Sequence, residues 1–226
     1  MMCEDSTIIP NHADPLILLG AGGHARVLMD ALYPSQQKIL GLYIPPDASV
    51  PPWGEKILRI SSDAALLQQF PPRTVHLIMG IGSVASNEKR KQLFIHYRNL
   101  GYRFASVVHP RHYCAQAVTI GEGCQLMAGS MIQPGTTLHD NVILNTGAII
   151  DHDCQIESHV HIAPGAVLSG GIHVGSGVHI GTGAVIIQGI HIGSGALVAA
   201  GATVVTDVPE NARVVGIPAK PVHGLR

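Results

Sequence analysis

Large aromatic side chains and an excess of charge of one sign are both missing from this sequence of 226 residues. Aromatic residues make up only 4% of the chain, and 14 Lys plus Arg nearly balance 15 Asp plus Glu. The balanced charge offers no basic surface for nucleic acid or for an anionic membrane, so we expect neither as a partner. Few aromatics beside 26 glycines are typical of thin repetitive layers rather than of a core packed around large rings.

Long apolar runs and closely spaced cysteines are absent as well. No segment approaches the roughly 20 apolar residues of a membrane span, and the first 14 residues, which we interpret as a tail, lack the basic start and apolar stretch of a signal peptide. We therefore expect a cytoplasmic protein without membrane insertion. The four cysteines, Cys3, Cys114, Cys124 and Cys154, show no CxxC spacing, so neither a disulfide framework nor a zinc site is indicated.

A repeat of six residues fills the second half of the sequence. From Ile120 the chain divides without a gap into units that run from IGEGCQ to VVTDVP, each opening on Ile, Leu or Val, with a small or β-branched fifth residue. This period predicts a parallel β-helix over residues 108–209, in which each unit forms one side of a prism and the opening residues point inward. Three units complete a coil, which gives about five coils, with glycine at the fourth position releasing the backbone at each corner.

The segment before the repeat predicts a small α/β domain over residues 15–107. PLILLGAGGHARVLMDALYPS, at 15–35, combines an apolar run, a glycine-rich turn and a helical pattern. VHLIMGIGS, at 75–83, indicates another strand with a second glycine turn, followed by a helix over 85–101 with Ser86 as a possible N-cap. The order predicts a Rossmann-like βαβαβ fold joined to the prism.

The first glycine turn is the motif of this domain that suggests a ligand. Gly20, Gly22 and Ala25 match G-x-G-x-x-G/A, a turn that brings backbone N–H groups close to a phosphate at a helix N-terminus. A nicotinamide dinucleotide also requires an acid about 20 residues later, where this sequence has Tyr43 and Ile44. A nicotinamide cofactor is therefore disfavoured.

His152 stands out among the fourteen histidines. It occupies the third position of the unit IDHDCQ, between Asp151 and Asp153. A neighbouring carboxylate orients an imidazole and raises its basicity, which suits a general base near neutral pH. No Ser or Cys is paired with a base as a nucleophile, since the fifth position turns Cys154 into the core, so we expect direct transfer without a covalent enzyme intermediate.

Other histidines recur at the spacing of a coil. Residues 18 apart lie above one another, so His161 stacks on His179 and His173 on His191. Histidines near a corner are ordinarily solvent-exposed or lie in an interface. We keep this interpretation for a group of four: His139, His159, His173 and His191.

Four stretches together resemble one enzyme family. GAGGHARV, IDHDC, VHIAPGAVLSG and GIPAK, the last within a C-terminal segment at 210–226, are similar to the sugar O- and N-acyltransferases, over about residues 15–222. The resemblance implies a left-handed β-helix, a homotrimer without a metal, and transfer of acetyl from acetyl-CoA to the amine of a nucleotide-linked deoxysugar in surface glycan synthesis.

The resemblance also implies roles for particular residues. The catalytic histidine falls on His152, its acid on Asp153 and a preceding asparagine on Asn145. Contacts to acetyl-CoA fall on His161, Thr182 and Ala200. The turns that hold the nucleotide sugar correspond to Gly22, Gly23, His24, Gly82 and Ser83. An acidic pair often found after the second strand is Tyr43–Ile44 here, which leaves the nucleotide open among UDP, GDP and CMP.

Two alternatives remain open at this point. One is an O-acetyltransferase acting on a sialic-acid-like sugar, where a histidine base is needed even more because a hydroxyl is the poorer nucleophile. The other is a metal-dependent protein like the gamma-class carbonic anhydrases, which share the β-helix and bind zinc through histidines of neighbouring subunits. Against the second, that family lacks an N-terminal glycine-turn domain.

Overall fold

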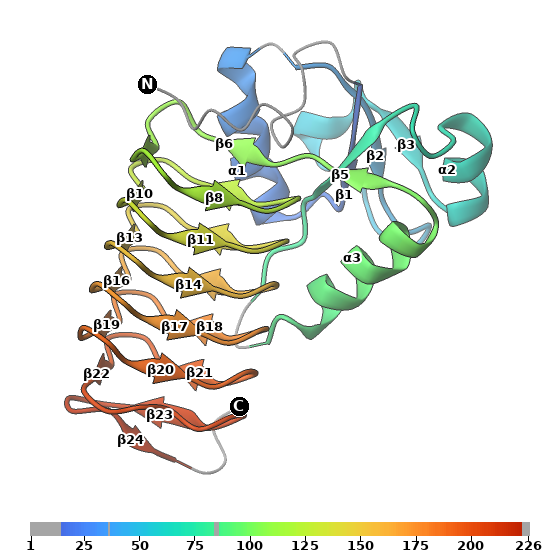
Figure 1. Ribbon diagram of the computed structural model, residues 1–226. Helices are drawn as coiled ribbons and strands as arrows, with labels where there is room; N and C mark the ends of the chain where they lie inside the picture. The colour runs from blue at the N-terminus through green and yellow to red at the C-terminus, as the bar shows by residue number, and fades with distance from the viewer. Residues whose placement is uncertain (1–14, 36, 84–85, 223–226) are drawn as a thin grey trace.

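The protein consists of an α/β domain that lies beside a long prism (Figure 1). The structure, a computed structural model, describes residues 15–35, 37–83 and 86–222. The expected tail at 1–14, with Cys3, and the last residues, 223–226, lie outside this part. Within the described ranges, no helix has the length and apolar character needed to cross a bilayer.

A parallel five-stranded sheet with the order β3-β2-β1-β4-β5 forms the α/β domain. Alternation in β1 explains its layers: Leu16 and Leu18 belong to the core shared with α1, whereas Ile17 and Leu19 pack with α2 and α3. The Rossmann-like fold is confirmed. Its elements are β1 (Leu16–Leu19), α1 (Gly23–Leu32), η1 (Tyr33–Ser35), β2 (Ile39–Tyr43), η2 (Pro52–Gly54), β3 (Leu58–Ile60), α2 (Asp63–Gln69), β4 (His76–Met79), α3 (Glu88–Asn99) and β5 (Arg103–Phe104).

The repeat forms the predicted prism of stacked coils. Neighbouring coils pair in parallel at a register of 18 residues, as in Ile143 with His161, and five turns separate β7 from β22. The left-handed β-helix of about five coils is confirmed. Its strands are β6 (Val107–Val108), β7 (Tyr113–Cys114), β8 (Thr119–Ile120), β9 (Gln125–Leu126), β10 (Met131–Ile132), β11 (Thr137–Leu138), β12 (Ile143–Leu144), β13 (Ile149–Ile150), β14 (Gln155–Ile156), β15 (His161–Ile162), β16 (Val167–Leu168), β17 (His173–Val174), β18 (His179–Ile180), β19 (Val185–Ile186), β20 (His191–Ile192), β21 (Leu197–Val198), β22 (Thr203–Val204), β23 (Arg213–Val215) and β24 (Lys220–Pro221).

Opening and fifth residues build the interior of the prism. From Ile120 to Val204 every opening residue is at most 7% exposed, and the fifth residues from Cys124 to Val208 are equally buried. Cys124 and Cys154 are buried free thiols, as their fifth positions predict. Cys114 is disulfide-bonded, which the absence of a CxxC spacing did not predict.

The fourth position of a unit turns the corner with a left-handed backbone. Glycine fills most of these positions, for example Gly147 at φ 65°. Three polar residues adopt the same conformation: Asn141 at φ 60°, Asp153 at 57° and His159 at 66°. A side chain at positive φ costs free energy that glycine does not, so these three positions carry side chains for another reason.

Asn87 fastens α3 to the prism. Helix α3 begins at Glu88, later than the expected 85, and its N-cap position is Asn87, while Oγ of Ser86 accepts from the backbone N–H of Glu88 at 3.3 Å. The Asn87 side chain makes no cap hydrogen bond. Its Nδ2 donates to the carbonyl oxygens of His159, at 2.9 Å, and Val178, at 2.8 Å.

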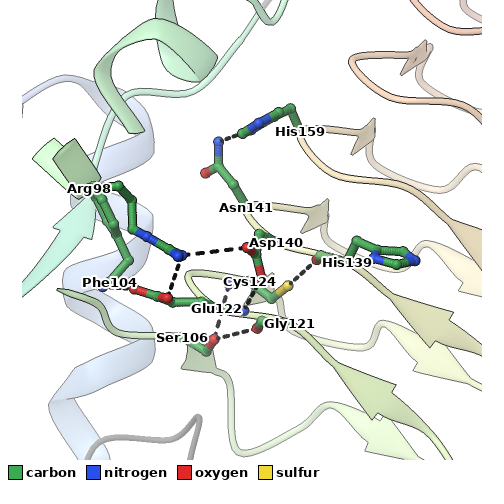
Figure 2. A network of polar contacts seen from close by, with 10 residues as sticks. All are labelled: Arg98, Phe104, Ser106, Gly121, Glu122, Cys124, His139, Asp140, Asn141 and His159. Carbon is green, nitrogen blue, oxygen red and sulfur yellow. Dashed lines mark hydrogen bonds and ion pairs between the residues drawn. The ribbon is translucent and has the colours of Figure 1, made fainter. Parts of the chain in front are cut away.

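A polar network continues this contact toward the C-terminal end of α3 (Figure 2). Arg98 forms ion pairs with Glu122 and, at 3.5 Å, with Asp140. Asn141 Nδ2 lies 2.9 Å from Nδ1 of His159, whose ring meets Phe94 edge-on. His159 is thus an interdomain contact, and burial with nearby positive charge lowers its pKa to about 4.

Replacing Asn87 with Ala should loosen the docking of α3 on the prism. The variant loses hydrogen bonds to buried carbonyl groups, which lowers the free energy of unfolding by about 1–3 kcal/mol. Urea denaturation followed by circular dichroism measures this loss. Asn99→Ala, at the exposed opposite end of the same helix, is the control; equal stability of the two variants would contradict the assignment.

Candidate active site

The two glycine turns lie side by side at the carboxyl end of the α/β sheet. Strands β1 and β4 are neighbours in the order β3-β2-β1-β4-β5, and the chain leaves them toward opposite faces. In open α/β sheets, ligands bind in the crevice at such a switch point. The first turn, at 20–23, and the second, at 80–83, therefore form the wall of a candidate binding site.

The glycines of these turns have different surroundings. A Cβ on Gly80 would lie 2.7 Å from the carbonyl oxygen of Leu19 and 3.0 Å from Cβ of Ala25, so the glycine lets α1 pack against β4. A Cβ on Gly22 or Gly23 would meet nothing within 4 Å. The backbone at these two glycines faces open space, where a ligand can reach the N-terminal end of α1.

His24, in the first turn of α1, connects the glycine turns to the prism. The Nε2 atom of His24 lies 2.6 Å from Oε1 of Gln125 on β9. A Cβ on Gly82 would lie 3.1 Å from the Cβ of His24. Burial, then the positive charge of Arg90, lowers the pKa of His24 to about 4. The ring is neutral at physiological pH.

His161, on β15, is held by Asn145 and Ser83. Its Nδ1 lies 2.7 Å from Oγ of Ser83, and its Nε2 lies 3.1 Å from Nδ2 of Asn145. Because Thr146 N–H donates to Oδ1 of Asn145, the amide presents N–H to Nε2, so the proton of His161 lies on Nδ1. Burial lowers its pKa to about 3, with His179 adding to the effect. The second glycine turn covers this side chain.

His152 lies at a different, exposed corner of the prism. Its Nδ1 is 2.8 Å from Oδ2 of Asp153, and the side chain of His152 is 51% exposed. The hydrogen bond to Asp153, followed by the charges of Asp151 and Asp153, raises the pKa of His152. A Cβ on Gly170, one coil later, would lie 2.5 Å from Nε2, so the imidazole in this orientation rests directly against the backbone of Gly170.

Thr182 and Ala200 follow one edge of the prism. Both are exposed third-position residues after β18 and β21, and the hydrogen bond from Gly201 N to Thr182 O links their successive coils. This edge also contains Asn145, which follows β12. His152 follows β13, whereas Asn145 precedes it. The two residues therefore lie at the two prism corners that flank the face formed by the six-stranded sheet β22-β19-β16-β13-β10-β7.

One chain therefore brings the predicted residues together only in part. His24, Gly82, Ser83, Asn145 and His161 gather where the α/β domain meets the prism. His152 and Asp153 lie a full face of the prism away. Over the residues that the structure describes, no group of three His, Cys, Asp or Glu side chains is arranged to hold a metal ion.

Comparisons with known proteins cover both domains. The PglD N-terminal domain family matches residues 15–96, and bacterial transferase hexapeptide (six repeats) matches 117–151 and 135–170. The hexapeptide repeat of succinyl-transferase matches 171–206. No curated protein matches the sequence.

Solved structures match nearly the whole chain. The acetyltransferase domain of PglB from Neisseria gonorrhoeae FA1090 is 33% identical, with a TM-score of 0.81 over 92% of this chain and 99% of that one. PerB from Caulobacter crescentus, in complex with CoA and GDP-perosamine, is 30% identical, with a TM-score of 0.82 over 93% and 98%. This chain belongs to the hexapeptide-repeat sugar acyltransferases. WeeI from Acinetobacter baumannii AYE has the same fold at 25% identity, with a TM-score of 0.81 over 93% and 100%.

Arg90 is a residue of this acyltransferase that sequence reasoning missed. It is 2% exposed, and its Nη1 donates to the carbonyl oxygens of Met79, at 2.9 Å, and Ile81, at 2.7 Å, which bracket the start of the second glycine turn. Burial lowers the pKa of Arg90 to about 9, and its charge helps to keep His24 and His161 neutral. In the sequence, a basic residue within a charged helix gave no signal of burial.

Replacing Asp153 with Asn should lower the pKa of His152. Asn tolerates the left-handed backbone at this corner but removes the carboxylate that favours the imidazolium. Titration of the His152 ring by NMR should therefore show its midpoint at lower pH than in the wild type. Asp151→Asn removes only a secondary charge and should shift the midpoint less; an unchanged midpoint in Asp153→Asn would contradict the pairing.

Proposed function

We propose that this acyltransferase uses acetyl-CoA to acetylate the amine of a nucleotide-linked amino-deoxysugar in surface glycan synthesis. The observation that carries the proposal is the exposed His152–Asp153 pair. It lies in a chain that is, over almost its full length, 33% identical to the acetyltransferase domain of PglB and 30% identical to a perosamine N-acetyltransferase. Its relatives support both substrates: the PglB domain has been solved with acetyl coenzyme A and PerB with CoA and GDP-perosamine.

In the proposed reaction, His152 is the general base. Asp153 accepts from Nδ1–H, which leaves the lone pair of Nε2 for the amine proton as the nitrogen attacks the thioester carbonyl. The C–N bond forms, the C–S bond breaks, and the CoA thiolate leaves with a proton from the imidazolium. Asp153 stabilises that imidazolium. Cys154 is buried, and burial raises the pKa of its thiol, which supports direct transfer.

The two substrates bind in different places: one along an edge of the prism, the other between the glycine turns. Acetyl-CoA extends along the edge that carries Thr182 and Ala200 and reaches Asn145 and His161. The small third-position residues leave the backbone of this edge accessible to a long ligand. The nucleotide sugar lies in the crevice between the glycine turns, where Gly22, Gly23, His24, Gly82 and Ser83 hold it. Both substrates are metabolites of the cytoplasm, where we expect the reaction to occur.

A homotrimer completes the site. His152 and Asn145 lie at opposite edges of the six-stranded sheet, so cyclic packing of three copies about this face joins the His152 edge of one subunit to the Asn145 edge of the next. The outward side chains of this face are mostly apolar, and Val185, Ile187 and Val205 are each 39–41% exposed in the single chain. The outward side chains on the strands of this six-stranded sheet are those of Tyr113, Met131, Ile149, Val167, Val185 and Thr203.

His152→Ala should lower kcat about 10²–10⁴-fold, the usual contribution of a general base, without unfolding the protein. Gly170→Ala should also lower kcat, because its new Cβ displaces the imidazole from its position. The measurement is thiol release from acetyl-CoA with a panel of UDP-, GDP- and CMP-linked amino sugars.

Ser169→Ala, at the neighbouring residue of the same coil, is the control for Gly170→Ala. Near-normal turnover by His152→Ala would remove His152 from the mechanism. Acetylation of hydroxyl sugars alone would replace the proposal with O-acetyl transfer.

Mixing subunits tests the shared site. His152→Ala and Asn145→Ala homotrimers should each be weakly active, whereas hybrids refolded from a mixture should regain activity, because one interface then contains both wild-type edges. The assay compares acetyl transfer before and after mixing, with self-mixed samples as controls. Absence of complementation in verified hybrids would contradict a site formed by two subunits.

A further inference from the structure

Gln125 is a buried polar residue that the repeat does not require. It fills the sixth position of its unit, on β9, where the side chain points out of the prism, and it is fully buried beneath the α/β domain. Other sixth positions hold residues as different as Thr137, Ile149 and His173. The repeat therefore tolerates many side chains here, and a glutamine needs a local explanation.

The hydrogen bonds of Gln125 fix the orientation of its carboxamide. Its Nε2 donates to the carbonyl oxygen of Met79 at 2.8 Å. Because a carbonyl oxygen only accepts, the amide nitrogen must face Met79 and Oε1 must face His24. The distance from that oxygen to Nε2 of His24 is 2.6 Å. Oε1 also only accepts, so the proton of the neutral imidazole lies on Nε2.

The tautomer decides what His24 can offer a ligand. With the proton on Nε2, Nδ1 carries the lone pair and accepts a hydrogen bond. His24 follows Gly22 and Gly23, whose backbones face open space. The charged or titratable groups that act on His24 from the packed elements are Arg90 of α3 and His161 of β15, and neither supplies an acid that would protonate the ring.

We propose that Gln125 is a positioning residue for nucleotide-sugar binding: anchored on Met79, it holds His24 in the Nε2–H tautomer, so that Nδ1 accepts from a hydroxyl or N–H group of the nucleotide sugar. This inference rests on the proposed function. Gln125 also joins the residue at the end of β4 to the first turn of α1. The prism thereby sets the relative position of the two glycine turns.

Two substitutions separate tautomer control from space filling. Gln125→Met keeps the length but removes both hydrogen bonds, so His24 should lose its single tautomer. Gln125→Glu still accepts from Nε2–H, but its carboxylate raises the pKa of His24. When His24 is protonated, Nδ1 also carries a proton. It can then no longer accept a hydrogen bond from a donor group of the sugar. Gln155, an exposed sixth-position glutamine on β14, gives the matched controls Gln155→Met and Gln155→Glu.

The experiment combines ¹⁵N-histidine NMR with kinetics on the full-length protein. Wild type should show His24 protonated on Nε2, and Gln125→Met should show a mixture of tautomers with KM for the nucleotide sugar raised about tenfold, the effect of one hydrogen bond, and KM for acetyl-CoA unchanged. In Gln125→Glu, sugar KM should fall as the pH rises from about 6 to 8.5, as His24 loses its proton. The wild-type protein should lack this pH dependence, because the pKa of its His24 is about 4.

Several results would overturn the proposal. They are an Nδ1–H tautomer in wild type, a wild-type tautomer and sugar KM in Gln125→Met, or a pH-independent sugar KM in Gln125→Glu. A loss of kcat alone, with both KM values unchanged, would assign Gln125 to structure only. Failure of the proposed function is distinguishable, because wild type would then acetylate no sugar in the panel while the NMR spectra still report the tautomer.

Discussion

The backbone pairing of each coil with the next, 18 residues away, is the constraint on which this structure depends. The register continues from β7 to β22, and it requires an apolar opening residue and a compact fifth residue in every unit to fill a narrow interior. The second, third and sixth positions point away from that interior. The residues at these three positions can therefore vary without disturbing the core of the prism. His152, Thr182 and Gln125 all occupy these outward positions.

The corners add a second constraint, because the fourth residue adopts positive φ. A side chain there costs roughly 1–2 kcal/mol relative to glycine. Asp153 and His159 both adopt positive φ at such corners, but their side chains have different roles. Asp153 is exposed and hydrogen-bonds the adjacent His152, whereas His159 is buried against Phe94 of α3. One strained corner thus supports an acid–base pair, and the other fastens the two domains together.

Docking of the α/β domain divides the histidines into two chemical classes. His24 and His161 lose solvent beneath the glycine turns, near the buried charge of Arg90, and their pKa values fall to about 4 and 3. They are neutral hydrogen-bonding groups with defined tautomers. His152 remains in solvent beside carboxylates, which raise its pKa. The same side chain serves as a binding group or as a base because burial and neighbouring charge differ.

The sequence by itself determined the prism, the coil length, the inward residues and the glycine-turn domain, because each follows from local periodicity or from a turn that only glycine permits. It also marked His152 through its flanking acids. Burial of Arg90 and Gln125 and the docking role of His159 were decided only by tertiary structure. Those properties arise where segments distant in sequence meet, and no local pattern records which face of the prism the α/β domain covers.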